Sequence, residues 1–301
     1  ARALPVEVGG PVLVYAGVKP GETVRAAAAD VRAGEVVLRA GSSIGPAAIG
    51  VLASVGKATV MVHRRPRVAI LATGDELVDV ERRPGPGEIR NSNNYAVAAQ
   101  VASWGAEAFN LGIARDDRRH LVAKLEQALQ FKPDLLVTSA GVSVGDYDLV
   151  KEVLDAMGTI SMWRVRVRPG KPLAFGRLGE GNVPFLGLPG NPVSAMVTME
   201  LFGRPAILKM LGKKRLERPV VMARVLENLE NHGGREHYIR GVVSRERDEY
   251  VARSTGDQGS NLLTSMAKAN ALLVVDEKTT LVREGEMVRA MMLEWPDESS
   301  R

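Results

Sequence analysis

The amino-acid sequence predicts an α/β fold with a mostly parallel central sheet, a β-rich region before it and a β-barrel-like region after it. Three observations support this prediction. Between residues 66 and 213, apolar runs of strand length alternate with segments of helical periodicity. Polar loops follow the apolar runs, at the sheet edge where ligands bind in such folds. After residue 214, short apolar or alternating runs lie between polar turns, as in a small β-barrel.

The central region consists of alternating predicted strands and helices. Its first strand is a continuous apolar run, which indicates burial on both faces, and it leads directly into the polar sequence Thr-Gly-Asp-Glu. The later helices follow turn or capping residues. In chain order we predict strand 68–72, helix 94–104, strand 107–113, helix 118–130, strand 135–139, helix 149–157, strands 160–167, 173–177 and 184–188, and helix 192–211.

The flanking regions are predicted from shorter patterns. The first 65 residues are expected to hold a β-rich part and a short helix near 46–55. The predicted strands of the C-terminal region lie at 220–225, 238–244, 250–253, 271–275 and 287–293. We therefore expect three regions, at 1–65, 66–213 and 214–301.

Composition narrows the classes of protein that this chain can belong to. Of 301 residues, 45% are hydrophobic, enough for buried cores, and none is cysteine, which excludes disulfides, thiolate zinc sites and a cysteine nucleophile. Apolar runs of membrane-spanning length do not occur. The net charge of +5 suits an anionic ligand, while an aromatic content of 4% argues against nucleic-acid binding. We expect a cytoplasmic enzyme with no membrane or nucleic-acid partner.

The most informative segment is Leu-Pro-Gly-Asn-Pro-Val-Ser-Ala at 188–195, which is typical of a strand, a tight turn and a helix. Asn191 is a favoured N-cap, and Pro192 suits the first helical position because that position needs no N–H. The free N–H groups and the positive end of the helix dipole could hold an oxyanion. A capped helix without a ligand has the same pattern, so this segment alone leaves both interpretations open.

A glycine-containing loop at 139–148 offers a candidate metal site. Gly141 and Gly145 permit close backbone approach to a ligand. Asp146 and Asp148 place two carboxylates two residues apart, an arrangement that suits Mg²⁺ beside a phosphate. Asp148 could instead simply cap the helix that follows it.

A cationic turn, Arg-Pro-Gly-Lys-Pro at 168–172, offers a candidate anion site. Its two prolines and its glycine limit how the loop can move, so Lys171 can be aimed at a ligand. The alternative is that Arg168 and Lys171 are ordinary solvated side chains.

Six motifs in this order carry a family resemblance: TGDEL (73–77), GEIRNSN (87–93), RDD (115–117), GVSVGDYD (141–148), RPGKP (168–172) and LPGNPVSA (188–195). Together they resemble the molybdopterin molybdenumtransferase family, which comprises the bacterial MoeA-type enzymes and the E domain of gephyrin. The resemblance covers about residues 20–293. It implies a molybdopterin-binding-like central domain and a homodimer. It also implies contacts with molybdopterin adenylyltransferase and with apo-molybdoenzymes.

The resemblance also implies a reaction, the last common step of molybdenum cofactor biosynthesis. Molybdate is placed on adenylyl-molybdopterin, and AMP is released by hydrolysis with help from Mg²⁺. As catalytic residues we expect Asp148, Glu76 and Asp116, and as metal ligands Asp146, Asp148 and Glu76. Molybdate, a tetrahedral dianion, requires cations, hydroxyls and N–H donors. The expected substrate-binding residues are Thr73, Gly74, Gly141, Ser143, Gly145, Arg168, Lys171, Pro189, Asn191, Pro192 and Ser194.

Departures from the family pattern keep other functions open. Ala140 stands where the family usually has glycine, and Arg168 where lysine is commoner. Family members also carry a substantial N-terminal portion before the segment corresponding to Val24, so we expect part of the leading domains to be missing here. The alternatives are a molybdopterin adenylyltransferase, or a catalytically weak binding or scaffold module.

Two further features have only local explanations. The four histidines are scattered without metal-ligand spacing, so we interpret them as surface or structural residues. Tyr238 and Arg240 share one face of a predicted strand. That face could be a dimer surface, a ligand surface or an ordinary solvated strand.

Overall fold

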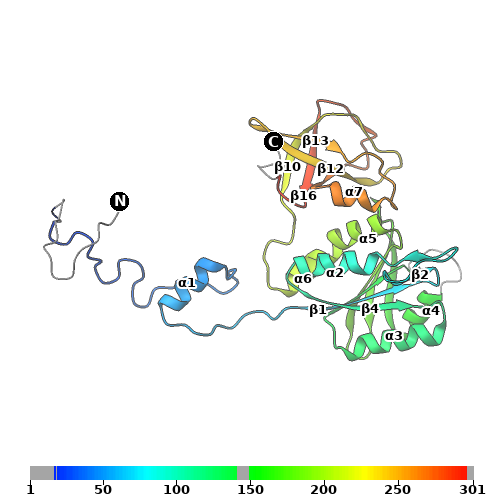
Figure 1. Cartoon of the computed structure of the whole chain (residues 1–301), viewed down its shortest axis with the longest axis horizontal. Helices are drawn as coiled ribbons and strands as arrows, with labels where there is room; N and C mark the ends of the chain where they lie inside the picture. Colours follow the sequence, from blue (N-terminus) through cyan, green and yellow to red (C-terminus); the bar gives the residue numbers. More distant parts are fainter. Residues whose placement is uncertain (1–16, 18, 141–148, 297–301) are drawn as a thin grey trace, which may run out of the picture. The chain divides into compact units, whose positions relative to one another are not determined.

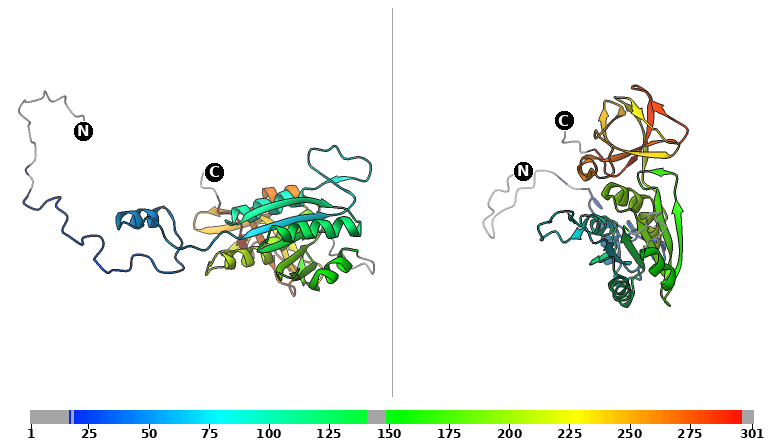
Figure 2. Two further views of the ribbon diagram at one scale, coloured as in Figure 1. Left: turned by 90° about the horizontal axis from the view of Figure 1, so that it is seen from below. Right: turned by 90° about the vertical axis from the view of Figure 1, so that its right-hand side faces the viewer.

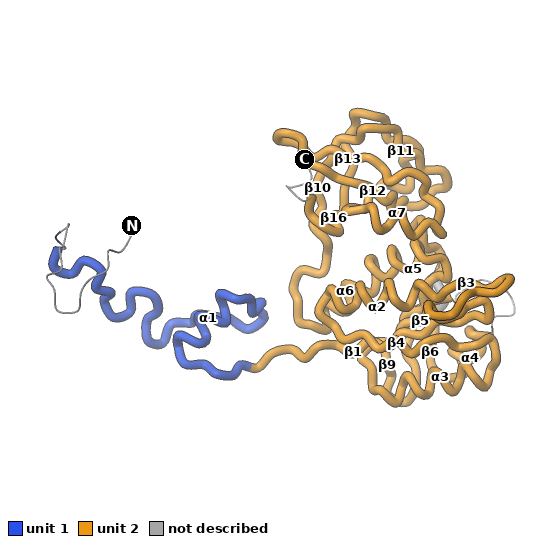
Figure 3. Tube along the Cα trace, viewed as in Figure 1, with its two compact units in different colours: residues 1–60 blue, residues 61–301 orange. Residues whose placement is uncertain are grey.

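The computed structural model describes residues 17, 19–140 and 149–296, and the chain divides into two compact units, 1–60 and 61–301 (Figure 3). In the described part of the first unit the one regular element is α1 (Pro46–Ser54), which confirms the short predicted helix. The same part holds no strand, contrary to the expected β-rich region. Val24 and Val36 are 75% and 64% exposed there, so their apolar side chains have no sheet face to bury.

The second unit begins with a six-stranded sheet in the order β4-β1-β5-β9-β8-β6 (Figure 1). The first four strands of this order pair in parallel, while β8 and β6 add antiparallel to the far edge. This arrangement confirms the predicted mostly parallel sheet. The strands are β1 (Arg67–Thr73), β4 (Glu107–Ala114), β5 (Leu135–Ser139), β6 (Gly158–Arg164), β8 (Pro172–Leu178) and β9 (Val183–Leu188).

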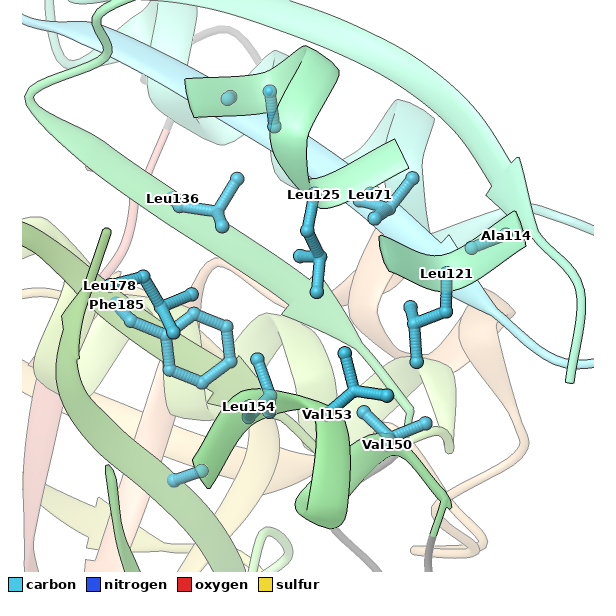
Figure 4. Close-up of a cluster of buried hydrophobic side chains, with 13 residues drawn as sticks. Leu71, Ala114, Leu121, Leu125, Leu136, Val150, Val153, Leu154, Leu178 and Phe185 are labelled. Carbon is cyan, nitrogen blue, oxygen red and sulfur yellow. The ribbon is translucent and has the colours of Figure 1, made fainter. Parts of the chain in front are cut away.

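Helices cover both faces of this sheet. Successive β1 side chains alternate between two apolar cores, because side chains of a strand point to opposite faces in turn. Leu71 packs with α3 and α4, as Figure 4 shows, whereas Ile70 packs with α2, α5 and α6 on the other face. The helices are α2 (Asn93–Ser103), α3 (Arg118–Gln130), α4 (Leu149–Met157), α5 (Pro192–Thr198) and α6 (Arg204–Met210), with the π-helical turn η1 (Met199–Gly203) between the last two.

Two predicted central elements differ in detail. The helix expected at 192–211 contains the π-helical turn because Pro205 has no N–H and its ring excludes the normal carbonyl four residues back. Arg204 accordingly donates its N–H to Met199 O, five residues back. The strand expected at 160–167 is divided between β6 and β7 (Val167–Arg168), and these two strands belong to different sheets.

The C-terminal strands close into a barrel, seen as a ring in the right-hand view of Figure 2. Their order is β13-β10-β16-β14-β12, and an additional β12–β13 pairing closes the ring. The strands are β10 (Val220–Val225), β12 (Glu236–Glu246), β13 (Glu249–Ser254), β14 (Ala271–Val275) and β16 (Met287–Met292). All five correspond to predicted strands, so the expected barrel is confirmed.

Short elements were not predicted, because two-residue strands and a six-residue helix leave little periodicity to read. They are β2 (Leu77–Val78), β3 (Ile89–Arg90), β11 (Leu229–Glu230), β15 (Leu281–Val282) and α7 (Leu263–Lys268). Among the described residues, no helix has both the length and the apolar character that a membrane crossing requires.

The barrel and the central sheet meet along α5. Val193 and Val197 of this helix share an apolar cluster with Tyr238 and Leu272 of the barrel. Tyr238 is 8% exposed and Arg240 fully buried, so the solvated-strand interpretation of this face is wrong. A second link is β7, which pairs with β12 while the loop after it leads back to β8 of the central sheet. These contacts bring barrel loops to the carboxyl ends of the central strands.

Candidate functional site

A cleft of about 940 Å³ opens where the carboxyl ends of the central strands meet the barrel loops. Central-domain segments supply most of its walls, as expected for a parallel sheet, whose ligands bind beyond the strand ends. Arg235 and a barrel loop supply the remaining wall. The wall segments from the chain's described part are 76–77, 89–93, 139–140, 168–172, 189–192 with Ser194, and 258–261.

The structure brings most of the described predicted site residues together in this cleft. Seven of them line it: Glu76, Arg168, Lys171, Pro189, Asn191, Pro192 and Ser194. Three others, Thr73, Gly74 and Asp116, are not among the lining residues. The remaining five, Gly141, Ser143, Gly145, Asp146 and Asp148, lie outside the described residues.

Positive charge dominates the described walls. Arg90, Arg168, Lys171 and Arg235 line the cleft, and Glu76 is the single carboxylate among the described lining residues. Opposite charges attract strongly in a concave, partly desolvated site. The cleft is therefore suited to an anionic ligand of more than one negative charge.

The cationic turn at 168–172 is held by packing as well as by its prolines. Gly170 has φ +106°, and a Cβ there would lie 2.4 Å from Thr198 Oγ1, so only glycine lets the turn rest on α5. Arg168 is half-buried and donates from Nη1 to His232 O at 3.3 Å. Lys171 is exposed at the cleft. The fixed backbone therefore presents a mobile ammonium to the ligand space.

The N–H groups at the start of α5 are less available to a ligand than the sequence suggests. Asn191 occupies the N-cap position, but its side chain does not cap the helix and instead donates from Nδ2 to Ser260 Oγ at 3.0 Å. The N–H of Val193 donates to Ser260 O at 3.1 Å. The expected side-chain cap is therefore wrong, and a barrel loop occupies one of the N–H groups expected to hold an anion.

The RDD motif (115–117) holds the TGDEL loop (73–77) by hydrogen bonds. Arg115 donates from Nη1 to Asp75 O at 3.0 Å, and the Asp116 N–H donates to Asp75 Oδ1 at 3.1 Å. Asp117 caps α3 by accepting from the His120 N–H at 2.9 Å. In the described structure the RDD motif thus holds the loop that presents Glu76, while the Asp116 side chain is exposed away from the cleft walls.

Two buried polar atoms at the cleft lack partners within the described residues. Asn91 and Ser139 are each 1% exposed and line the cleft, yet Asn91 Nδ2 and Ser139 Oγ make no hydrogen bond there. Buried polar groups are nearly always hydrogen-bonded in folded proteins. These two groups are therefore unpaired polar atoms within the cleft wall, and a ligand reaches them only when the wall around them adjusts.

Comparison with known proteins decides the family. Family models match in chain order: the MoeA N-terminal region (domain I and II) at 4–56, the probable molybdopterin binding domain at 69–209 and the MoeA C-terminal region (domain IV) at 222–293. The chain is 39% identical to molybdopterin molybdenumtransferase 1 of Mycobacterium tuberculosis over 94% of its own length and 67% of that protein's. This chain belongs to the molybdopterin molybdenumtransferase family.

Two further similarities agree with the family and the fold. Gephyrin of Dictyostelium discoideum is 33% identical over 91% of this chain and 43% of gephyrin. A crystal structure of the molybdopterin biosynthesis MoeA protein from Pyrococcus horikoshii aligns with a TM-score of 0.71 at 26% identity. That alignment covers 87% of this chain and 62% of the other, so the chain spans less than two thirds of its structural relative. The predicted family is confirmed.

Sequence reasoning missed the barrel's contribution to the cleft of this molybdopterin molybdenumtransferase family member. Arg235, Gln258 and Ser260 line it, and none of them is among the site residues predicted from the sequence. No local pattern reports which surfaces of two domains face each other. The signal that could have found them was the concentration of glycine, serine and arginine in loops of an otherwise apolar barrel.

The predicted metal ligands are only partly placed. Within the described residues, no group of three or more histidine, cysteine, aspartate or glutamate side chains could hold a metal ion. Glu76 is the one predicted ligand that the structure describes, since Asp146 and Asp148 lie outside the described residues.

Proposed function

We propose that this chain binds adenylyl-molybdopterin and molybdate in the cleft, inserts molybdenum at the molybdopterin dithiolene, and releases AMP by hydrolysis. The observation that carries this proposal is the convergence of Arg168, Lys171 and Glu76 from separate loops on one cleft. Family membership supplies the reaction, and the cleft supplies the chemistry that the reaction needs. The whole reaction remains a proposal for a chain that spans about two thirds of its relatives.

The cations would act on the oxyanions of both substrates. Lys171 carries a mobile ammonium that can follow a tetrahedral dianion. Arg168 offers a planar fork, but one of its amino groups is already held by His232 O. Both charges neutralise negative charge that molybdate brings and that hydrolysis of the phosphoanhydride develops. Asn91 Nδ2 and Ser139 Oγ would orient the remainder of the bound substrate.

We also propose that Mg²⁺ takes part in the release of AMP. When bound, it supplies charge neutralisation at the phosphoanhydride. Glu76 would hold it together with Asp146 and Asp148, the other two metal ligands expected from the sequence. Because the described residues provide a single carboxylate there, we assign no step to the ion.

The contribution of the barrel to the cleft favours this reaction over that of a molybdopterin adenylyltransferase, the alternative enzyme. Adenylyltransfer would need only the α/β region, whereas this cleft is completed by Arg235 and the loop at 258–261. If the chain only bound these substrates, it would release no AMP. We further propose domains at 66–213 and 214–301, a cytoplasmic homodimer, and contacts with molybdopterin adenylyltransferase and apo-molybdoenzymes. These proposals rest on the family.

The decisive experiment measures molybdate-dependent AMP release from adenylyl-molybdopterin. We expect Lys171→Ala to lower the rate by about 10²-fold, because it removes a charge that the transition state uses. Lys278→Ala is the matched control, since Lys278 is an exposed lysine on a barrel turn that does not line the cleft. A wild-type chain that binds both substrates without releasing AMP would refute the transferase, and a fully active Lys171→Ala would remove Lys171 from the site.

A further inference from the structure

Arg240 of β12 is the largest fully buried side chain in the described structure, and it carries a charge. Burial is the main reason that its pKa falls to about 10, the Asp257 carboxylate opposes this fall, and nearby Arg168 adds to it. The guanidinium still remains protonated at neutral pH. Burying such a charge costs free energy unless its hydrogen bonds compensate, so its contacts indicate what it does.

Those contacts all run to one segment, residues 255–265. Arg240 Nη2 donates to Gly259 O at 3.0 Å, and Nε donates to Ser265 Oγ at 3.0 Å. The Arg240 backbone N–H donates to Gln258 Oε1 at 2.8 Å, and Thr255 N–H donates to Arg240 O at 2.9 Å. Both the side chain and the backbone of one strand residue therefore hold this segment.

The held segment is the barrel wall of the cleft. Gln258, Gly259 and Ser260 line it. Ser260 then contacts the central domain, where Ser260 O accepts from the Val193 N–H and Ser260 Oγ accepts from Asn191 Nδ2. A continuous set of hydrogen bonds thus runs from Arg240 through the wall to the start of α5.

We propose that Arg240 is a positioning residue for the part of the cleft between residues 189–192 and 258–260, where we expect an oxyanion to bind. It does not line the cleft, but its fork fixes the 258–260 wall against the turn at 189–192. Its Nη1 has no hydrogen-bond partner among the described residues, while the Asp257 carboxylate of the held segment favours the charged guanidinium. The identity of the ligand rests on the proposed function, whereas the hydrogen bonds made by Arg240 do not depend on it.

The first test is amide hydrogen exchange, which needs no substrate. Arg240→Met removes both the fork and the charge, while Arg240→Lys keeps the charge but cannot bridge Gly259 and Ser265. In both variants we expect the amide hydrogen of Val193 to exchange roughly tenfold faster. This factor corresponds to the loss of about one charged hydrogen bond. Arg245→Met is the matched control, because Arg245 is exposed on the same strand. Unchanged Val193 exchange in Arg240→Lys would overturn the positioning role.

The second test uses inorganic molybdate, by calorimetry and by kinetics. We expect both Arg240 variants to bind it about tenfold more weakly, with KM for molybdate raised and kcat within about twofold of wild type. A variant with unchanged KM would overturn the proposal. If Arg240→Met does not fold, Arg240→Lys decides. A wild-type chain that fails to bind molybdate would sink the proposed function, whereas the exchange result would still decide what Arg240 holds.

Discussion

The Glu76 carboxylate lies directly against the α-carbon of Gly74. A Cβ at residue 74 would stand 2.5 Å from Glu76 Oε2 and 2.8 Å from its Oε1 and Cδ. Gly74 also has φ +140°, a backbone conformation that side chains rarely adopt. The glycine of the TGDEL motif thus makes room for the acidic group that lines the cleft two residues later.

Gly74→Ala should therefore impair the site more than the fold. The new methyl group must displace the flexible carboxylate, and a displacement of about 1 Å can cost about 10²-fold in rate. Backbone strain should lower the free energy of unfolding by about 1–3 kcal/mol. AMP release and thermal unfolding measure the two effects. Glu76→Gln keeps the packing and removes the charge. Full activity in Gly74→Ala would show that the position of Glu76 does not matter.

Ala140→Gly should stabilise the protein by about 0.5–1 kcal/mol. Ala140 has φ +72°, where a Cβ costs about 1–2 kcal/mol, and this exceeds the added chain entropy of glycine. Ala140 also lines the cleft, so removal of its methyl group widens the cleft. Denaturant unfolding measures the change. The same substitution at exposed Ala99 inside α2 should destabilise instead. A loss of stability in Ala140→Gly would show that the positive φ of Ala140 does not strain the backbone.

Ser139→Ala should separate stability from binding. Because the Ser139 hydroxyl is buried without a described partner, its removal should leave the free energy of unfolding unchanged or raise it by up to about 1 kcal/mol. Binding of adenylyl-molybdopterin, measured by calorimetry, should weaken about tenfold. Thr138→Val is the matched control: its hydroxyl is equally buried and unpartnered, but it does not line the cleft. Equal binding by the two variants would remove Ser139 from the ligand site.

The fold was predictable where local pattern and burial agree. The continuous apolar run of β1 indicated a strand covered on both sides, and Ile70 and Leu71 do pack into different cores. The π-helical turn before Pro205 could also have been anticipated, because a proline inside a helical pattern always requires a local rearrangement.

The site was less predictable, because its walls come both from loops of the central sheet and from loops of the barrel. Asn191 has the ideal local chemistry for an N-cap, yet its side chain bonds to Ser260, which lies 69 residues away in the chain. For Arg240 the sequence left a dimer surface, a ligand surface and a solvated strand open, whereas the folded barrel buries it completely. Tertiary contacts decided both residues, and no short-range pattern contains that information.

His237 is a buried imidazole that resists protonation. It is 3% exposed, and the backbone of Glu230 only partly offsets the cost of charging its ring. Burial first, and then the charge of Arg168, lower its pKa to about 4 from 6.5. The histidine therefore stays neutral in the folded protein at pH values where the unfolded chain binds a proton.

Stability should consequently fall between about pH 6.5 and pH 4. In that window the unfolded state binds more protons, so acidification favours unfolding by at most about 1.4 kcal/mol per pH unit. Above about pH 7.5 this residue is almost fully deprotonated in both states, so its contribution is constant there. Denaturant unfolding at several pH values measures the slope, which His237→Gln should flatten. His232→Gln, at an exposed histidine beside Glu230, should retain it. Identical slopes in wild type and His237→Gln would show that another group controls acid stability.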